Sequence, residues 1–326
     1  MKSIVTLVFF LSTVASAQST NLPTTRVARF DGDRPAALSY TFDDNLRDQY
    51  TLAVPMLNEV GFKGTFFVVP GVTAETVAEA EEKLKNNRAW GSITWTELKE
   101  MAAQGHEIAS HSWSHPNLQK LPPEEVEAEL SKACDEIKKR VGTPALSLAF
   151  PFNAATPEVR AAALKHHVAF RAYQLGIGAK TTAASLDAWA DKQVQEKKWG
   201  VAMFHAIAKG YAALDNPEEL RVHWKNVKAR EQEIWVDTFA NVARYARERD
   251  ESRLTCTGTT GKMTCMFTSE LDPKVYDVPL TIVIEVKGAA TAKAERAGKE
   301  VPVFVLSDAI QVKAAPGPDA ILVTWK

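Results

Sequence analysis

The sequence of 326 residues lacks an excess of charge of either sign, a hydrophobic run long enough to cross a membrane, internal repeats and low-complexity segments. Its 39 Lys and Arg residues balance 40 Asp and Glu residues, so net charge gives no reason to expect nucleic acid or an anionic membrane surface as a partner. The 45% of apolar residues excludes disordered and fibrous chains. This composition suits one large or two ordinary globular domains.

The first 17 residues have the pattern of an export signal. Lys2 precedes an apolar run over residues 4–11, and residues 15–17 (Ala-Ser-Ala) form a small-residue cleavage site. A retained anchor is the alternative, but the run is shorter than the roughly 20 residues that a spanning helix needs. We therefore expect cleavage near Ala17, no membrane span in the mature protein, and a secreted or periplasmic location.

The three cysteines fall into two classes. Cys256 and Cys265 flank a Thr/Gly-rich stretch typical of a hairpin turn, and an exported protein meets an oxidising environment, so we predict a disulfide between them. Cys134 lies in a Lys/Glu-rich helical pattern, which predicts a half-buried free thiol with no chemical role.

From residue 37 to about residue 250, short apolar runs alternate with longer amphipathic segments. The runs predict strands at residues 37–42, 64–69, 106–111, 146–151, 168–173, 200–205 and 234–239. The segments predict helices at residues 49–60, 94–104, 123–141, 157–166, 182–198 and 217–233. Alternation of this kind indicates an α/β fold with parallel strands. Because polar residues gather after the strands, we favour a distorted, seven-stranded (β/α) barrel over an open doubly wound sheet.

The pattern changes after residue 253. Predicted strands at residues 254–256, 263–267, 278–286, 300–306 and 320–325 are separated by Gly, Pro, Asp and Ser, and only residues 289–297 look compatible with a helix. We therefore expect a catalytic domain over residues 18–250 and a small all-β, sandwich-like accessory domain over residues 251–326.

Two short motifs carry candidate chemistry. In residues 111–115 (HSWSH), two histidines four apart can converge on one metal ion, although two solvent-facing histidines are the commoner explanation. In residues 41–44 (TFDD), one of two adjacent carboxylates can bind the metal while the other takes a proton from water, although a turn or a helix cap uses the same residues. Each motif supports the metal interpretation of the other.

Together these motifs resemble the NodB-like polysaccharide deacetylases of carbohydrate esterase family 4. The resemblance also includes residues 61–67 (GFKGTFF), 105–108 (GHEI), 150–153 (FPFN) and 201–205 (VAMFH). It implies that Asp43 is the catalytic base and that Asp44, His111 and His115 hold one divalent metal ion, for which zinc is our first choice. It further implies that His205 is the general acid and that metal-activated water attacks an acetyl carbonyl.

The sequence departs from the family pattern in three places. Asn45 stands where the family has Gly, but Asn tolerates the left-handed backbone too. Ala149 replaces the Arg that tethers the catalytic base, and we expect Arg171 to take its place, with a surface salt bridge as the alternative. The Asp that tunes the acid histidine has no clear counterpart; Asp237 is a weak candidate, and Asp187 and Asp191 are weaker.

Aromatic and amide side chains supply candidate substrate contacts. We expect Trp113, Phe152 and Asn153 to contact the sugar or its acetyl group, and Trp90 and Trp95 are further candidates because indole rings stack on sugar rings. Ordinary packing in the barrel is an equally good explanation for Phe152.

These residues predict an exported, metal-dependent hydrolase that removes N-acetyl or O-acetyl groups from a polysaccharide or oligosaccharide. One alternative is an O-acetyl esterase acting on xylan or another plant or algal glycan. An alternative of another class is a catalytically weak carbohydrate-binding protein. The replacement of the family Arg by Ala149 is the feature that supports this alternative. The sequence identifies neither the sugar nor the oligomeric state.

Overall fold

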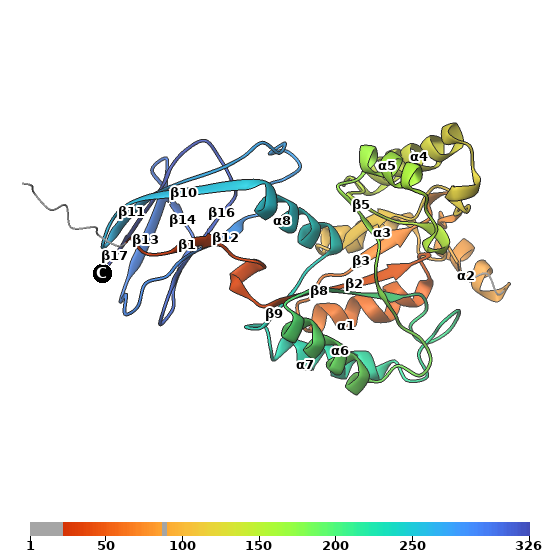
Figure 1. Ribbon diagram of the computed structural model, residues 1–326. Coiled ribbons are helices and arrows are strands. Elements are labelled where there is room, and N and C mark those ends of the chain that lie inside the picture. The colour runs from red at the N-terminus through yellow and green to blue at the C-terminus, as the bar shows by residue number, and fades with distance from the viewer. Residues whose placement is uncertain (1–21, 87–89) are drawn as a thin grey trace, which may run out of the picture.

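The computed structural model describes residues 22–86 and 90–326 and shows two packed parts connected by helix α8, Phe239–Glu251 (Figure 1). One part is a parallel sheet surrounded by helices, and the other consists of two antiparallel sheets. The predicted export signal lies outside the described residues. Within the described ranges, no helix is both long and apolar enough to cross a bilayer.

The parallel sheet follows the strand order β6-β5-β4-β3-β2-β8-β7. Its strands are β2 Ala36–Asp43, β3 Thr65–Val68, β4 Glu107–Ser110, β5 Ser147–Ala149, β6 Ala169–Arg171, β7 Leu175–Gly176 and β8 Trp199–Phe204. Strand β9, Ile234–Val236, also runs parallel to β2 but pairs with it outside this order. No pairing among the described residues joins β6 to β7, so the curled sheet is an incomplete barrel, which confirms the predicted fold.

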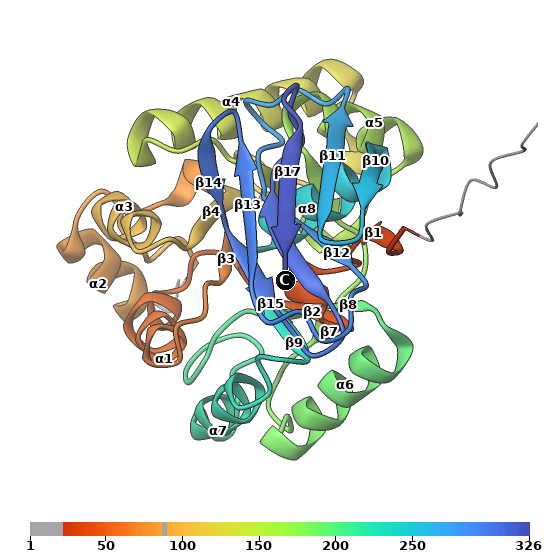
Figure 2. The same cartoon turned by 90° about the vertical axis from the view of Figure 1, so that its left-hand side faces the viewer.

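Helices surround this sheet, as Figure 2 shows from the side of the antiparallel sheets. They are α1 Val54–Glu59, α2 Val77–Lys85, α3 Trp95–Ala103, α4 Pro123–Val141, α5 Pro157–His166, α6 Ala183–Glu196 and α7 Glu218–Lys228. A π-helix, Gln49–Ala53, runs directly into α1, and the 3₁₀ turns are Asp31–Asp33, Pro70–Val72, Leu118–Lys120 and Pro151–Asn153. The bounds predicted for α4 and α5 are confirmed.

Side chains of β2 alternate between the helices and the barrel interior. Tyr40 and Phe42 point outward, where they lie fully buried in the main apolar core, and the Phe42 ring stacks on Phe66 and Phe204. Thr41 and Asp43 point inward, where both accept hydrogen bonds from Arg171. The strand therefore packs the core with one face and supplies the interior with polar groups from the other.

The antiparallel sheets have the orders β1-β12-β16-β15 and β10-β11-β17-β13-β14. Their strands are β1 Thr25–Val27, β10 Ser252–Thr259, β11 Lys262–Ser269, β12 Leu280–Ile284, β13 Ala292–Arg296, β14 Lys299–Val301, β15 Val303–Val305, β16 Ile310–Ala314 and β17 Ile321–Trp325. Strand β1 comes from the start of the chain and pairs antiparallel with β12, which the sequence pattern did not predict.

The helix-compatible interpretation of residues 289–297 is wrong. Residues 292–296 form strand β13, which pairs antiparallel with β14 and β17. Ala294 is buried while Lys293 and Glu295 are exposed, so the segment alternates with the period of a strand. Its Ala, Lys and Glu residues are typical of helices, but pairing on both sides overrides that preference.

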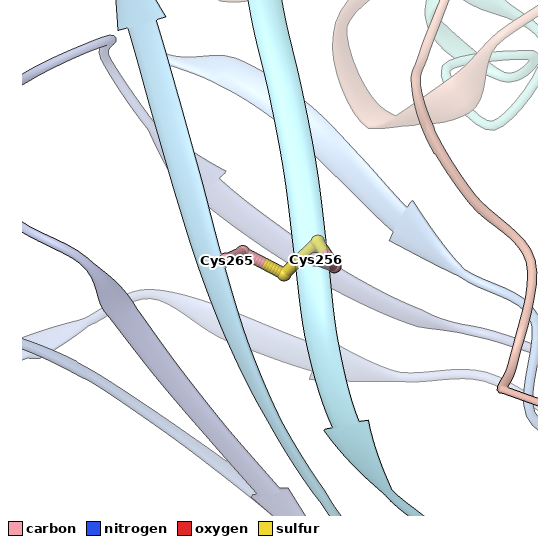
Figure 3. Close-up of a disulfide and its surroundings, with 2 residues drawn as sticks. All are labelled: Cys256 and Cys265. Atoms are coloured by element: carbon pink, nitrogen blue, oxygen red, sulfur yellow. A yellow bond between two sulfur atoms is a disulfide. The ribbon is translucent and has the colours of Figure 1, made fainter.

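The predicted disulfide is confirmed (Figure 3). Cys256 on β10 lies directly opposite Cys265 on β11, and their Cα atoms are 4.1 Å apart. Cys134 is a free, half-buried thiol, as predicted.

Candidate active site

The carboxyl ends of neighbouring strands surround a cavity of about 410 Å³. Asp43 ends β2, His111 follows β4 and His205 follows β8. The cavity is lined by Asp43, Asp44, His111, His115, Phe150, Phe152, Asn153, Met203, His205 and Tyr211. Most of these were predicted, but Met203 and Tyr211 were not. No motif marks Tyr211, which lies in the irregular segment after β8.

Asp44, His111 and His115 form a group whose ligand atoms all lie within 4.8 Å of one another. The Nε2 atoms of both histidines are 3.6 Å from Asp44 Oδ1. That oxygen is buried and has no hydrogen-bond partner within the described residues. Two imidazole nitrogens facing one free carboxylate oxygen make a donor set that suits a divalent transition metal such as zinc.

The protonation of this group suits a metal as well. His111 Nδ1 donates a hydrogen bond to the Ala149 carbonyl at 2.7 Å, which leaves Nε2 with a free lone pair. Burial lowers the pKa of His111 to about 4 and also lowers that of His115, so both rings are neutral at pH 7. In the metal-free protein, burial and the neighbouring Asp43 raise the pKa of Asp44 to about 7.

An unusual backbone conformation directs Asp44 toward the histidines. Asp44 and Asn45 both have positive φ, 72° and 40°. The Asn45 amide fixes this turn, because its Oδ1 accepts from the Val69 N–H and its Nδ2 donates to Thr73 Oγ1, each at 3.1 Å. As expected, the turn has a left-handed backbone with Asn in place of Gly.

Arg171 makes the contact that the sequence suggested. It lies 3% exposed, and its guanidinium donates to Asp43 Oδ1 at 2.7 Å and Oδ2 at 2.5 Å, while Thr41 Oγ1 accepts a third bond at 2.9 Å. The alternative of a surface salt bridge is therefore excluded. Arg171 on β6 is the register partner of Ala149 on β5, so the Arg reaches Asp43 from the strand adjacent to that of Ala149.

Two opposing effects set the charge of Asp43. Burial alone raises the pKa of its carboxyl, but the Arg171 guanidinium outweighs burial and leaves the pKa below its ordinary value. Asp43 is therefore ionised at neutral pH and is held in a two-point ion pair.

His205 lines the same cavity as Asp44, His111 and His115. Its Nε2 lies 3.8 Å from Asp44 Oδ2, and its ring meets the edge of the Tyr211 ring with centroids 4.9 Å apart. Burial lowers the pKa of His205. His205 Nδ1 is buried and has no partner among the residues that the structure covers.

None of the three carboxylates considered as partners of His205 contacts it. Asp237 follows β9, which pairs with the amino-terminal end of β2, and it lines a different cavity with Asp31 and Arg244. Asp187 accepts a hydrogen bond from His223, and Asp191 accepts one from Arg230. These three candidates are therefore wrong, because their side chains bind other partners than His205.

The predicted substrate contacts separate into two groups. Phe152 and Asn153 line the cavity, and the Phe152 ring is 66% exposed with its centroid 4.8 Å from that of His115. Trp113 is not among the lining residues, and its ring lies 3.9 Å from Lys132 Nζ. The ring centroid of Trp90 is 5.6 Å from that of His115, whereas Trp95 is buried in the main core.

Comparison with known proteins agrees with this geometry. The family described as polysaccharide deacetylase matches residues 31–170, which include β2 to β5 and both the TFDD and the HSWSH motif. Residues 31–170 of the chain therefore belong to the polysaccharide deacetylase family.

The relatives that match this chain differ from it in length. Gellan lyase of a Bacillus species is 22% identical over 345 aligned positions, covering 90% of this chain and 13% of that protein. The putative polysaccharide deacetylase YxkH of Bacillus subtilis strain 168 is 26% identical over 147 residues, covering 45% of this chain and 46% of YxkH. The chain thus spans less than half of either relative.

Among solved structures, a family 4 acetyl xylan esterase from Clostridium thermocellum, in complex with a cobalt ion, is 20% identical with a TM-score of 0.46. The match covers 63% of this chain and 89% of that one.

Proposed function

We propose that this protein is a metal-dependent deacetylase that hydrolyses N-acetyl or O-acetyl groups of a polysaccharide or oligosaccharide. The observation that carries the proposal is that one cavity holds the Asp44 carboxylate, two neutral imidazoles, an ionised Asp43 and His205. Hydrolysis of an acetyl group needs these elements: an electrophile, a base and an acid.

Asp44, His111 and His115 would hold the metal ion, with zinc as the proposed ion. When bound, it supplies a Lewis acid that polarises an acyl oxygen and makes water easier to deprotonate.

The remaining side chains divide the proton transfers between them. Asp43, ionised and held by Arg171, takes a proton from the attacking water as its oxygen bonds to the acetyl carbon. When the bond from that carbon to the sugar nitrogen or oxygen breaks, His205 donates a proton to the departing atom, and acetate is the second product. Phe152 and Tyr211, exposed at the cavity, offer flat apolar faces to a sugar ring.

Acetate release tests the proposal. Residues 18–326 are incubated with chitooligosaccharides, peptidoglycan, acetylated xylan and other acetylated glycans, both after metal removal and after addition of zinc. We expect acetate only with metal, and we expect Asp43→Asn to lower kcat by about 10²-fold or more while the protein still binds one metal ion.

The substrate that responds distinguishes N-deacetylation from the O-acetyl esterase alternative. If no glycan releases acetate although metal binds at His111 and His115, the carbohydrate-binding alternative replaces the enzyme. In that case Asp43→Asn should bind glycan as well as the wild type does. The contact between Arg171 and Asp43 favours the enzyme, because Arg171 gives Asp43 the cation that is missing at position 149.

We also propose that the protein is exported and acts outside the cytoplasm. The support is the signal pattern in residues 1–17, together with the disulfide between Cys256 and Cys265, since disulfides persist in oxidising compartments.

A further inference from the structure

Asp48 holds the backbone of residues 207–209, which follow His205. Asp48 Oδ2 accepts hydrogen bonds from three successive backbone N–H groups, those of Ile207 at 2.8 Å, Ala208 at 2.8 Å and Lys209 at 3.1 Å. Hydrogen bonds to an ionised carboxylate are stronger than neutral ones. Asp48, which follows the TFDD motif closely in the sequence, therefore anchors the backbone immediately after His205.

Gln49, the next residue, connects the two strand ends directly. Its fully buried Nε2 donates to the Asp43 carbonyl at 2.6 Å and to the His205 carbonyl at 2.9 Å. Gln49 opens the π-helix Gln49–Ala53, a rare conformation that often marks functional sites. A single amide thus bridges the backbone of the proposed base and that of the proposed acid.

These contacts matter because the His205 ring has little else to orient it. Its Nδ1 is buried and makes no hydrogen bond within the described part of the chain. The ring meets the edge of Tyr211, whose carbonyl accepts from the Ala206 N–H at 3.1 Å, and its Nε2 lies 3.8 Å from Asp44 Oδ2. The position of the imidazole is therefore set through the backbone that Asp48 and Gln49 hold.

We propose that Asp48 and Gln49 are positioning residues that hold His205 at its distance from Asp43 and Asp44. They orient the imidazole indirectly, through the backbone, whereas a carboxylate bonded to Nδ1 would orient it directly. This inference rests on the proposed function, since it assigns the proton donor to His205. It predicts that losing either side chain impairs proton donation to the leaving group more than any other step.

Comparing kcat for substrates with different leaving groups isolates the proton donation. 4-Nitrophenyl acetate releases a phenolate that needs no proton, whereas an acetylated sugar releases an amine or alkoxide that does. We expect Asp48→Ala and Gln49→Met to lower kcat on the glycan that responds in the acetate assay about tenfold more than kcat on 4-nitrophenyl acetate. His205→Gln should give the same pattern, and Asp48→Asn, which keeps an acceptor oxygen, should recover part of the loss.

A matched structural control is Thr182→Ala, which removes the side-chain cap of α6 on another part of the barrel. It should lower stability without changing the ratio of the two kcat values. Equal losses on both substrates, or no loss on either, would overturn the inference while leaving the deacetylase proposal intact. A wild type inactive on every substrate would instead overturn the proposed function, and this inference with it.

If Asp48→Ala does not fold, Gln49→Met and Asp48→Asn still decide the matter, because Met fills nearly the same space as Gln without its donors. Metal content measured on each variant checks that Asp44, His111 and His115 are undisturbed.

Discussion

At the scale of single residues, His106 is a buried imidazole outside the cavity whose state can be assigned. Its Nδ1 accepts a hydrogen bond from the Gly64 N–H at 3.1 Å, so the ring is neutral with its proton on Nε2. Nε2 is buried without a partner in the described residues, and the ring packs edge-on against Phe66. Burial, with a smaller effect of the Lys63 charge, lowers the pKa of His106 to about 4.

This pKa predicts a loss of stability in mild acid. An unfolded imidazole takes up its proton near pH 6.5, while folded His106 stays neutral down to about pH 4. Its contribution is therefore fully present above pH 6.5 and declines as the pH falls toward 4. By linkage, we expect the wild type to lose about 2 kcal/mol more than His106→Gln between pH 8 and pH 5, measured by urea unfolding at constant metal concentration. Parallel pH profiles for the two proteins would contradict this assignment.

The sequence identified candidate residues best where they lie close together in the chain. Asp43 and Asp44 share one motif, and His111 and His115 share another, so spacing alone suggested a site. Arg171 was found only because Ala149 left Asp43 without a cation.

Asp48 and Gln49 carried no comparable signal. They act on backbone groups that lie 156 to 161 residues away, and no spacing rule connects a side chain to a distant carbonyl or N–H. Tyr211 was missed for a similar reason, since only the fold of residues 206–214 places it beside His205.

At the scale of elements, the pairing of β5 with β6 explains how Arg171 reaches Asp43. Ala149 and Arg171 are opposite each other in register, and Ala149 packs with Phe67 and Ala109 inside the barrel. The Arg171 guanidinium lies over the Phe67 ring, 5.0 Å from its centroid. Because Ala149 on β5 is small, the barrel interior has room for the long side chain of Arg171 from β6.

This register predicts that the cation can be moved between the two strands. Arg171→Ala should lower kcat by about 10²-fold, because Asp43 loses both hydrogen bonds that fix it. The double variant Ala149→Arg/Arg171→Ala should regain part of the loss. Acetate release on the responding glycan measures both variants.

Arg171→Lys is the matched control, since it keeps the charge but not the fork that bonds both carboxylate oxygens, and it should lie between the wild type and Arg171→Ala. A double variant no better than Arg171→Ala, although folded and metal-bound, would show that β5 cannot present the cation to Asp43.

Predicted element boundaries were accurate where the chain has strong start and stop signals. Helix α4 begins at Pro123, and Gly142 follows its last residue with a φ of 93°, so both ends could be read from the sequence. Strand β7 has only two residues, too few to show a period. Strand β13 depends on partners on both sides, which its own composition does not reveal.

At the scale of the whole molecule, one apolar core joins the barrel to the antiparallel sheets. Phe30, Trp235 and Tyr245 belong to the same buried cluster as Ile282 and Val312 of the first antiparallel sheet. The Tyr245 hydroxyl on α8 donates to the Ala28 carbonyl at 3.1 Å and accepts from the Thr281 N–H at 3.3 Å. The two parts are therefore packed as one body around α8, as Figure 1 shows.

This shared core predicts cooperative unfolding. Calorimetry of the wild type should show a single transition, because neither part keeps its buried surface when the other unfolds. Tyr245→Ala should lower the free energy of unfolding by about 3 kcal/mol and weaken the coupling, so that two transitions separate. Tyr245→Phe keeps the ring and should keep the single transition. Two resolved transitions in the wild type would show that the core does not couple the parts.

The pairing of β1 with β12 also constrains the order in which the protein can fold. Thr25 lies opposite Ile284, so partners about 260 residues apart in the chain must meet to complete that sheet. During synthesis, β1 emerges early and stays unpaired until residues 280–284 exist, while β2 and β3 can already associate. An early strand with a late partner presents an open edge that other chains can join. The slow, concentration-sensitive step in folding should therefore be the closure of this sheet rather than the formation of the barrel.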